Sequence, residues 1–152
     1  EPGVIELSRG RLLMWCRTNT GVQVTSESTD EGESWSPVKP SNIHSPLAPA
    51  SIKYWPGTTD LVMLWNDHYD PKAGWSAGSR TPMNIAVSHD EGETWVNEKV
   101  VDGDPNGWFC YYSMHFDKDR LIISHCGGNK ATGGLNTLRV TEVDRKWVFS
   151  EK

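Results

Sequence analysis

The sequence predicts an all-β protein, a partial β-propeller made of four-stranded antiparallel units. Three observations lead to this prediction: short apolar runs with a period of two, turn-forming residues between them, and one eight-residue motif that recurs. The composition agrees, because 152 residues include 8 Trp, 14 Gly and 9 Pro. Bulky aromatic residues together with turn formers are typical of many short strands. We expect few helices or none.

The apolar runs have the length of strands and alternate apolar with polar positions. They lie at residues 4–7, 12–16, 22–26, 51–54, 61–65, 84–88, 109–116, 121–125 and 138–143. Between them stand tight-turn sequences such as Ser-Arg-Gly at residues 8–10 and Pro-Gly-Thr at residues 56–58. Gly, Asn and Asp tolerate the backbone angles of such turns, so consecutive strands should be antiparallel neighbours.

A repeated motif marks the turn after the third strand of two units. Residues 28–35 read Ser-Thr-Asp-Glu-Gly-Glu-Ser-Trp, and residues 88–95 read Ser-His-Asp-Glu-Gly-Glu-Thr-Trp. The Asp can accept bonds from nearby amides, the Gly supplies a positive φ, and the Trp can pack back over the turn. We therefore interpret Asp30 and Asp90 as structural, and expect fourth strands over residues 35–38 and 95–101.

These strands divide the chain into three units at residues 1–39, about 49–102 and about 108–152, of which the third lacks the motif. Closed propellers need about four to eight four-stranded blades. Three blades would leave two open apolar sheet faces, so we expect the missing blades to come from the same parent chain or from another subunit. The sequence starts abruptly on the first strand of a blade, which favours the first alternative.

Charge and spacing argue against several classes of function. The formal net charge is −5 and basic residues form no run, so no nucleic-acid partner is expected. The longest apolar runs, such as residues 12–16, are far shorter than the roughly 20 residues of a membrane-spanning helix. Three Cys without a Cys-x-x-Cys pair, and five His without ligand spacing, argue against a disulfide framework, a metal site or a metal cofactor.

The two copies of the motif, which we call boxes, resemble the Asp boxes of the bacterial neuraminidase repeat. The chain resembles the sialidase (neuraminidase) superfamily of six-bladed propellers. The resemblance covers the whole chain but only the C-terminal half of that fold. Residues 1–17 resemble a sialidase stretch of Glu, two residues, Val-Val-Glu-Leu, a turn with Gly, a Leu-Leu strand and a terminal Arg. The resemblance implies that Glu1 is the partner of the catalytic Tyr and that Arg17 belongs to a carboxylate-binding Arg triad.

Two later segments extend the resemblance. Residues 79–90 resemble the strand that an Arg opens before an Asp box, which implies that Arg80 is a second triad member. Residues 109–114 resemble the first strand of the last blade, where the family has a nucleophilic Tyr followed by a small hydroxyl residue and, three positions on, an aliphatic residue. Tyr111 fits the aliphatic spacing and Tyr112 fits the hydroxyl residue, so the choice stays open. We prefer Tyr111, because Tyr112 shares a strand face with apolar neighbours.

This set of residues suits an acidic sugar. Guanidinium groups bind a sugar carboxylate through paired, charge-assisted bonds. The sugar carboxylate would repel an anionic nucleophile. A neutral phenol that loses its proton to a nearby protein carboxylate during attack reduces this repulsion. Sialidases with a Tyr nucleophile are known exceptions among glycosidases. The resemblance therefore implies an exo-sialidase-like, retaining glycoside hydrolase. The first triad Arg and the Asp acid/base have no counterpart here, so the chain alone should be catalytically incomplete.

Two other classes of function remain open. One is a non-catalytic carbohydrate-binding propeller, and the other is a polysaccharide lyase or a different glycosidase on the same scaffold. Further loop residues could contact substrate. Three of them, Asp67, His68 and Asp70, follow the strand at residues 61–65. Two others are Trp75 and Trp108, which belong neither to the repeated motif nor to a predicted strand.

Overall fold

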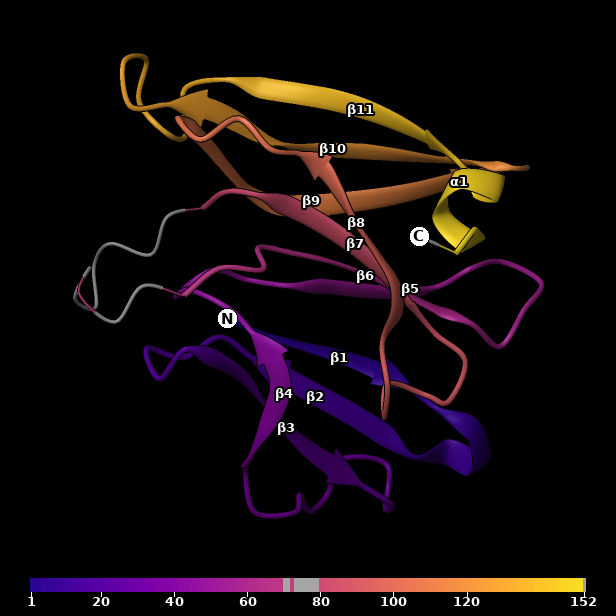
Figure 1. Cartoon of the computed structure of the whole chain (residues 1–152). Helices are drawn as coiled ribbons and strands as arrows, with labels where there is room; N and C mark the ends of the chain where they lie inside the picture. Colours follow the sequence, from indigo (N-terminus) through magenta and orange to yellow (C-terminus); the bar gives the residue numbers. More distant parts are fainter. Residues whose placement is uncertain (70–71, 73–79, 152) are drawn as a thin grey trace.

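The structure, a computed structural model, describes residues 1–69, 72 and 80–151. It consists of three antiparallel sheets stacked like successive blades (Figure 1). The first sheet has the order β1 (Pro2–Glu6), β2 (Leu12–Cys16), β3 (Val22–Ser28), β4 (Lys39–His44), and the second β5 (Ser51–Tyr54), β6 (Leu61–Trp65), β7 (Met83–Ser88), β8 (Val96–Asp102). The third contains β9 (Gly107–Asp117), β10 (Arg120–Asn129) and β11 (Leu138–Asp144). The predicted all-β fold of propeller-type blades is confirmed.

The first strands of the three sheets lie next to one another, and later strands lie further out. β1 contacts β5, and β5 contacts β9. Two side chains of β5 join it to the main chain of β9: Ser51 Oγ donates to the Tyr112 carbonyl at 2.8 Å, and Lys53 Nζ donates to the Met114 carbonyl at 3.1 Å. We call the edge at which β1, β5 and β9 begin the rim. Because neighbours are antiparallel, second strands end at the rim and third strands begin there.

The hydrophobic core forms two layers, one on each face of the second sheet. One layer, between the first and second sheets, includes Leu13, Trp15 and Met63; the other, between the second and third sheets, includes Leu64 and Phe109. Every residue of β6 is buried because its sheet is covered on both faces. The apolar run at residues 61–65 is therefore continuous rather than alternating.

Both boxes form the same hydrogen-bonded turn. Asp30 accepts from the Ser34 N–H at 2.9 Å through Oδ1 and from the Ser34 hydroxyl at 2.5 Å through Oδ2, and Ser28 Oγ accepts from the Gly32 N–H at 2.9 Å. The two bonds from Ser34, followed by a bond that the Ser28 hydroxyl donates to Asp30 Oδ1 at 2.7 Å, lower the pKa of Asp30 to about 2. Gly32 has a φ of +92°, which favours glycine. Asp30 is thus a structural acceptor, and its counterpart Asp90 makes the matching bonds in the second box.

The structure corrects two expected fourth strands. The fourth strand of the first sheet is Lys39–His44, not residues 35–38, so this sheet extends beyond residue 39. Pro37 has no N–H to give to a ladder, and pairing resumes only after it.

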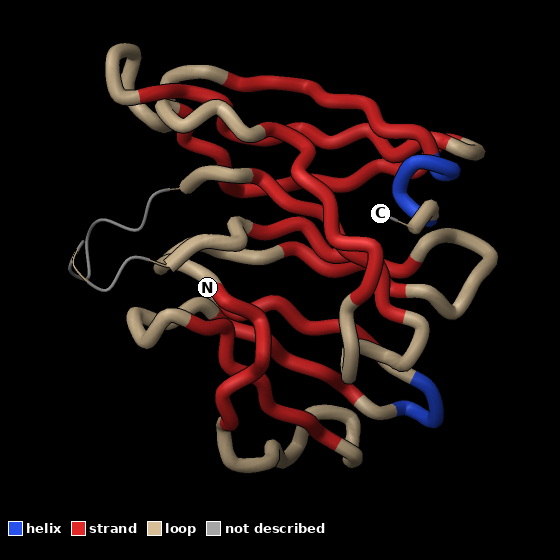
Figure 2. The backbone as a smooth tube through the Cα atoms, in the orientation of Figure 1, coloured by secondary structure: helices blue, strands red, loops and turns tan. Residues whose placement is uncertain are grey.

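The predicted fourth strand of the third unit is wrong, because that sheet has three strands in the described part of the chain. A short helix, α1 (Arg145–Phe149), follows β11 instead, and Figure 2 shows it with the short 3-10 turn η1 (Ser8–Gly10) among the strands. Asp144 caps α1 by accepting from the Lys146 N–H at 2.7 Å. Val148 of α1 is buried in the core. Over the residues described, none of the helices has the length and apolar character to cross a membrane.

Candidate functional site

Glu1 and Arg17 meet at the rim because of strand pairing. β1 and β2 are antiparallel with Pro2 opposite Cys16, so the residue before β1 lies beside the residue after β2. Arg17 Nη2 lies 3.0 Å from Glu1 Oε2. From the third sheet, Tyr111 Oη donates to the other carboxylate oxygen, Glu1 Oε1, at 3.5 Å. The Glu1 carboxylate therefore links a guanidinium of one sheet to a phenol of another.

Arg80 lies next to Tyr111 at the same rim, just before β7. Its guanidinium carbon is 5.5 Å from the centre of the Tyr111 ring and 5.2 Å from that of the Trp108 ring, and Nη2 donates to the Leu47 carbonyl at 3.5 Å. Burial alone would lower the pKa of Arg80, but the neighbouring Cys110 and Tyr111 raise it above its ordinary value. Arg80 is thus a permanent cation. The structure brings all four sequence-predicted residues together in the order Arg17, Glu1, Tyr111, Arg80.

A β-bulge presents Tyr111 at the rim. Ser113 pairs with Ser124 and Cys110 with Cys126, so Tyr111 and Tyr112 both stand opposite His125. Tyr111 takes a φ of +56°, a left-handed conformation that a bulky side chain rarely adopts, and its side chain remains 45% exposed. Such strained positions are frequent at functional sites. Reading the sequence by period two does not reveal this bulge.

The neighbours of Tyr111 have different surroundings. Tyr112 is buried, and its hydroxyl donates to the Phe109 carbonyl at 3.1 Å. Burial raises the pKa of Tyr112 far above its usual range. Burial also raises the pKa of the Cys110 thiol, although Arg80 opposes the shift, so this thiol is protonated at neutral pH. Tyr111 is the exposed phenol of the pair.

The remaining candidate residues divide into three groups. Trp108 lies at the site through its ring contact with Arg80, a pairing that the sequence did not predict. Asp67 and His68 follow β6, where the Asp67 N–H donates to Asn84 Oδ1 at 3.3 Å. Asp70 and Trp75 lie outside the described residues. No group of three His, Cys, Asp or Glu side chains within the described ranges could hold a metal ion.

Solved structures share this fold. The intramolecular trans-sialidase of a leech aligns with a TM-score of 0.74 at 14% identity over 97% of this chain, and that of Ruminococcus gnavus with 0.72 at 16% over 100%. The α-L-arabinanase of Penicillium chrysogenum aligns with 0.62 at 14% over 94%. This chain covers 24%, 34% and 45% of those three chains, respectively.

The sequence comparisons give the family. No curated protein matches the sequence. The BNR repeat-like domain matches residues 1–123, which include both boxes and all four rim residues. This match spans most of the chain, and the chain therefore belongs to the BNR repeat-like domain family, with the blade architecture of sialidase-type propellers.

Proposed function

We propose that this chain carries the nucleophile side of an acidic-sugar site in a retaining, sialidase-like glycosidase. The observation that carries the proposal is the contact of Tyr111 Oη with Glu1 Oε1 across two sheets, with Arg17 and Arg80 on either side. Glycosidases with this blade architecture, among them the leech trans-sialidase, support it.

Arg17 and Arg80 would bind the carboxylate of the sugar. A planar guanidinium offers paired donors to a carboxylate, with a geometry that Lys lacks. Arg17 already binds Glu1 Oε2, so it would present its remaining N–H groups to the substrate. Arg80 is held by the Leu47 carbonyl and by two aromatic rings, which fixes the direction of its donors before substrate binds.

Tyr111 would be the nucleophile and Glu1 its base. Attack of Tyr111 Oη on the anomeric carbon forms the O–C bond, the phenolic proton passes to Glu1 Oε1, and the glycosidic bond breaks with its electron pair on the leaving oxygen. The 3.5 Å separation is longer than a transferring hydrogen bond, as is common in ligand-free sites, and should shorten with substrate. Water then hydrolyses the glycosyl-tyrosine and configuration is retained.

The chemistry needs two groups that the sequence does not place here, a third Arg and an acid for the leaving oxygen. We propose that further blades, of the same polypeptide or of another subunit, supply both. A carbohydrate-binding propeller without catalysis would keep the Arg pair and lack the acid. A glycosidase for another sugar is the second candidate, since the arabinanase shares the fold.

The test compares Tyr111→Phe with Tyr112→Phe in the complete polypeptide that carries this chain. With an aryl sialoside as substrate, Tyr111→Phe should lower kcat/KM on the order of 10³-fold or more, whereas Tyr112→Phe should retain most activity. A fluorinated sialic acid that traps the covalent intermediate should add its mass to the peptide with Tyr111. Normal turnover by Tyr111→Phe, or an adduct elsewhere, would refute the assignment.

A further inference from the structure

Two free cysteines face each other across the third sheet. Cys110 of β9 stands directly opposite Cys126 of β10 in the antiparallel register. Directly opposite residues of an antiparallel pair carry their side chains on the same face of the sheet. The two thiols are therefore neighbours in space, although they lie far apart along the chain. We call Cys110 and Cys126 the cysteine pair.

Main-chain hydrogen bonds define the spacing of the cysteine pair. The Phe109 N–H donates to the Arg80 carbonyl at 2.8 Å. Gly127, which stands opposite Phe109, donates its N–H to the Thr137 carbonyl at 2.9 Å. These two N–H groups point to other strands, so Phe109 and Gly127 form a non-hydrogen-bonded pair. Because the two kinds of pair alternate along an antiparallel ladder, the adjacent cysteine pair is a hydrogen-bonded one, with Cα atoms about 5.5 Å apart.

This spacing suits a disulfide bond. Disulfides join residues whose Cα atoms are roughly 4.4–6.8 Å apart, so the backbone of the cysteine pair already meets the requirement. The pKa of the Cys110 thiol gives independent support. Burial raises this pKa most, Arg80 lowers it, and Cys126 adds a smaller rise, which is expected of a sulfur atom close by.

The two thiols differ in their access to solvent. Cys110 is completely buried, whereas Cys126 is partly exposed. A small reagent in solution therefore reaches Cys126 first, and Cys110 is its internal partner. This arrangement of one accessible and one buried thiol permits a two-step exchange with an external disulfide.

The cysteine pair borders the bulge that presents Tyr111. Cys110 directly precedes Tyr111, and Cys126 directly follows His125, the residue that stands opposite the bulge. A covalent link here would close one end of the bulge, where Tyr111 has a left-handed backbone. Such a link restrains the local opening of the two strands beside it.

We propose that Cys110 and Cys126 are a redox pair whose reversible disulfide restrains the Tyr111 bulge. The oxidant is a low-molecular-weight disulfide such as oxidised glutathione. The Cys126 thiolate attacks one sulfur of this reagent, which forms a mixed disulfide and releases one glutathione thiolate. Cys110 then attacks Cys126 Sγ, which forms the protein disulfide and releases the second glutathione, and the Cys110 proton passes to that leaving sulfur. Two protein thiols are thus oxidised while one glutathione disulfide is reduced to two thiols.

The test treats the complete, folded polypeptide that carries this chain with glutathione mixtures of increasing oxidised fraction, without any sugar. Free thiols are then alkylated and the protein is digested with trypsin without reduction. Trypsin cleaves after Lys118 and Arg120, so the two cysteines lie in separate peptides unless a disulfide joins them. Mass spectrometry should find these peptides joined with the loss of two hydrogen atoms. An excess of reduced glutathione should separate them again.

Cys16 provides the matched control for this reaction. It is partly exposed like Cys126, but it stands opposite Pro2 and Val24 rather than another cysteine. Cys16→Ser should therefore leave the link intact. Cys110→Ser should stop the reaction at the mixed disulfide, with one glutathione on Cys126. If that variant does not fold, Cys126→Ser at the partly exposed position serves instead, and its buried Cys110 should stay free of glutathione.

Hydrogen exchange followed by mass spectrometry measures the effect on the bulge. In the oxidised protein, the peptides that contain Tyr111 and His125 should exchange at least about 3-fold more slowly than in the reduced protein, whereas peptides of the first sheet should not change. Cys126→Ser should exchange equally in both glutathione mixtures. A link that forms only after unfolding in urea, a wild-type Cys126 that keeps its glutathione, or equal exchange in both redox states would overturn the proposal.

Discussion

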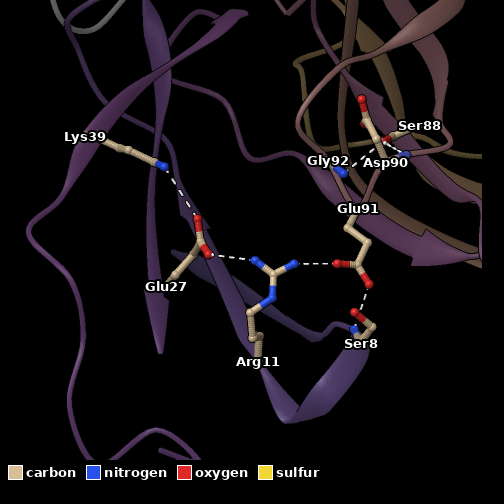
Figure 3. Close-up of polar contacts among 8 residues, drawn as sticks. All are labelled: Ser8, Arg11, Glu27, Lys39, Ser88, Asp90, Glu91 and Gly92. Atoms are coloured by element: carbon tan, nitrogen blue, oxygen red, sulfur yellow. Dashed lines mark hydrogen bonds and ion pairs between the residues drawn. The ribbon is translucent and has the colours of Figure 1, made fainter. Parts of the chain in front are cut away.

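The two boxes provide a matched pair of substitutions that measures the contact between the first and second sheets. Glu31 and Glu91 occupy the same box position, and both have a φ of +59°. Glu91 binds Arg11 and the Ser8 N–H of the neighbouring sheet (Figure 3), whereas Glu31 lies exposed on the first sheet itself. Replacing each Glu by Gln keeps shape and backbone and removes the charge. The difference between the two variants therefore isolates the inter-sheet contact.

The structure sets the size of this difference. Exposed ion pairs contribute roughly 0.2–1 kcal/mol, and hydrogen bonds to charged groups about 1.5–3 kcal/mol. The side chains of Arg11 and Glu91 are 33% and 26% exposed, so solvent screens the pair partly. We expect Glu91→Gln to lower the free energy of unfolding by about 1 kcal/mol and the melting temperature by about 2–4 °C. Glu31→Gln should change either quantity by less than about half as much.

Thermal and urea unfolding at low and high salt provide the assay. The penalty of Glu91→Gln should shrink in 1 M salt, where the screening length falls to about 3 Å. The bonds from Ser8, followed by Arg11, lower the pKa of Glu91 in the folded chain. Its ionised form therefore stabilises the fold above the ordinary value of 4.5, and this stabilisation disappears as the pH falls through the lowered pKa. Equal effects of the two variants at neutral pH and low salt would refute the reasoning.

Three further predictions concern the blades. The carboxyl of Asp30 should titrate near pH 2 by NMR, because the bonds from Ser34 lower its pKa most. The ionised carboxylate stabilises the fold fully above pH 3.8, its ordinary pKa, and this stabilisation is lost as the pH falls through about 2. A titration midpoint at pH 3.8 would contradict the box geometry. Leu64→Ala, at a site with 0% exposure, should cost about 2–5 kcal/mol in urea unfolding, against less than about 0.5 for Val38→Ala at 67% exposure; similar losses would contradict the two-layer core. Tyr112→Phe should cost about 1 kcal/mol in thermal unfolding through its lost bond to a main-chain carbonyl, and an unchanged melting temperature would count against that bond.

Much of the fold follows from local patterns in the sequence. The strand limits at residues 12–16, 51–54 and 61–65 are those of β2, β5 and β6, because alternation or continuous apolarity reports burial directly. The predicted fourth strand of the third unit is wrong for a reason that is also local. The segment after β11 contains one valine, Val148, which is buried, and Asp144 caps a helix there by accepting from the Lys146 N–H. This cap is a local signal for a helix rather than a fourth strand.

The candidate site depends on contacts that no local pattern contains. The motifs pointed to Glu1, Arg17, Arg80 and Tyr111 through resemblance, and the sheets bring them together from distant parts of the chain. The left-handed backbone of Tyr111 results from a mismatch with the partner strand, which a single strand cannot reveal. The surroundings of the two box tryptophans are equally invisible in the sequence. Trp35 and Trp95 occupy identical motif positions, yet the Trp35 indole donates to the Gly32 carbonyl, whereas the Trp95 indole has no hydrogen-bond partner among the described residues.

Recognition of a carboxylate at the rim is the central claim, and one comparison tests it most directly. Binding of N-acetylneuraminic acid and of its uncharged methyl ester is measured by titration of the ¹⁵N-labelled chain, followed at the indole signal of Trp108 beside Arg80. We predict that the acid binds at least about 10-fold more tightly than the ester, a difference of about 1.4 kcal/mol, and that Arg80→Met removes the preference. Equal binding of acid and ester, or a preference that survives Arg80→Met, would contradict the account.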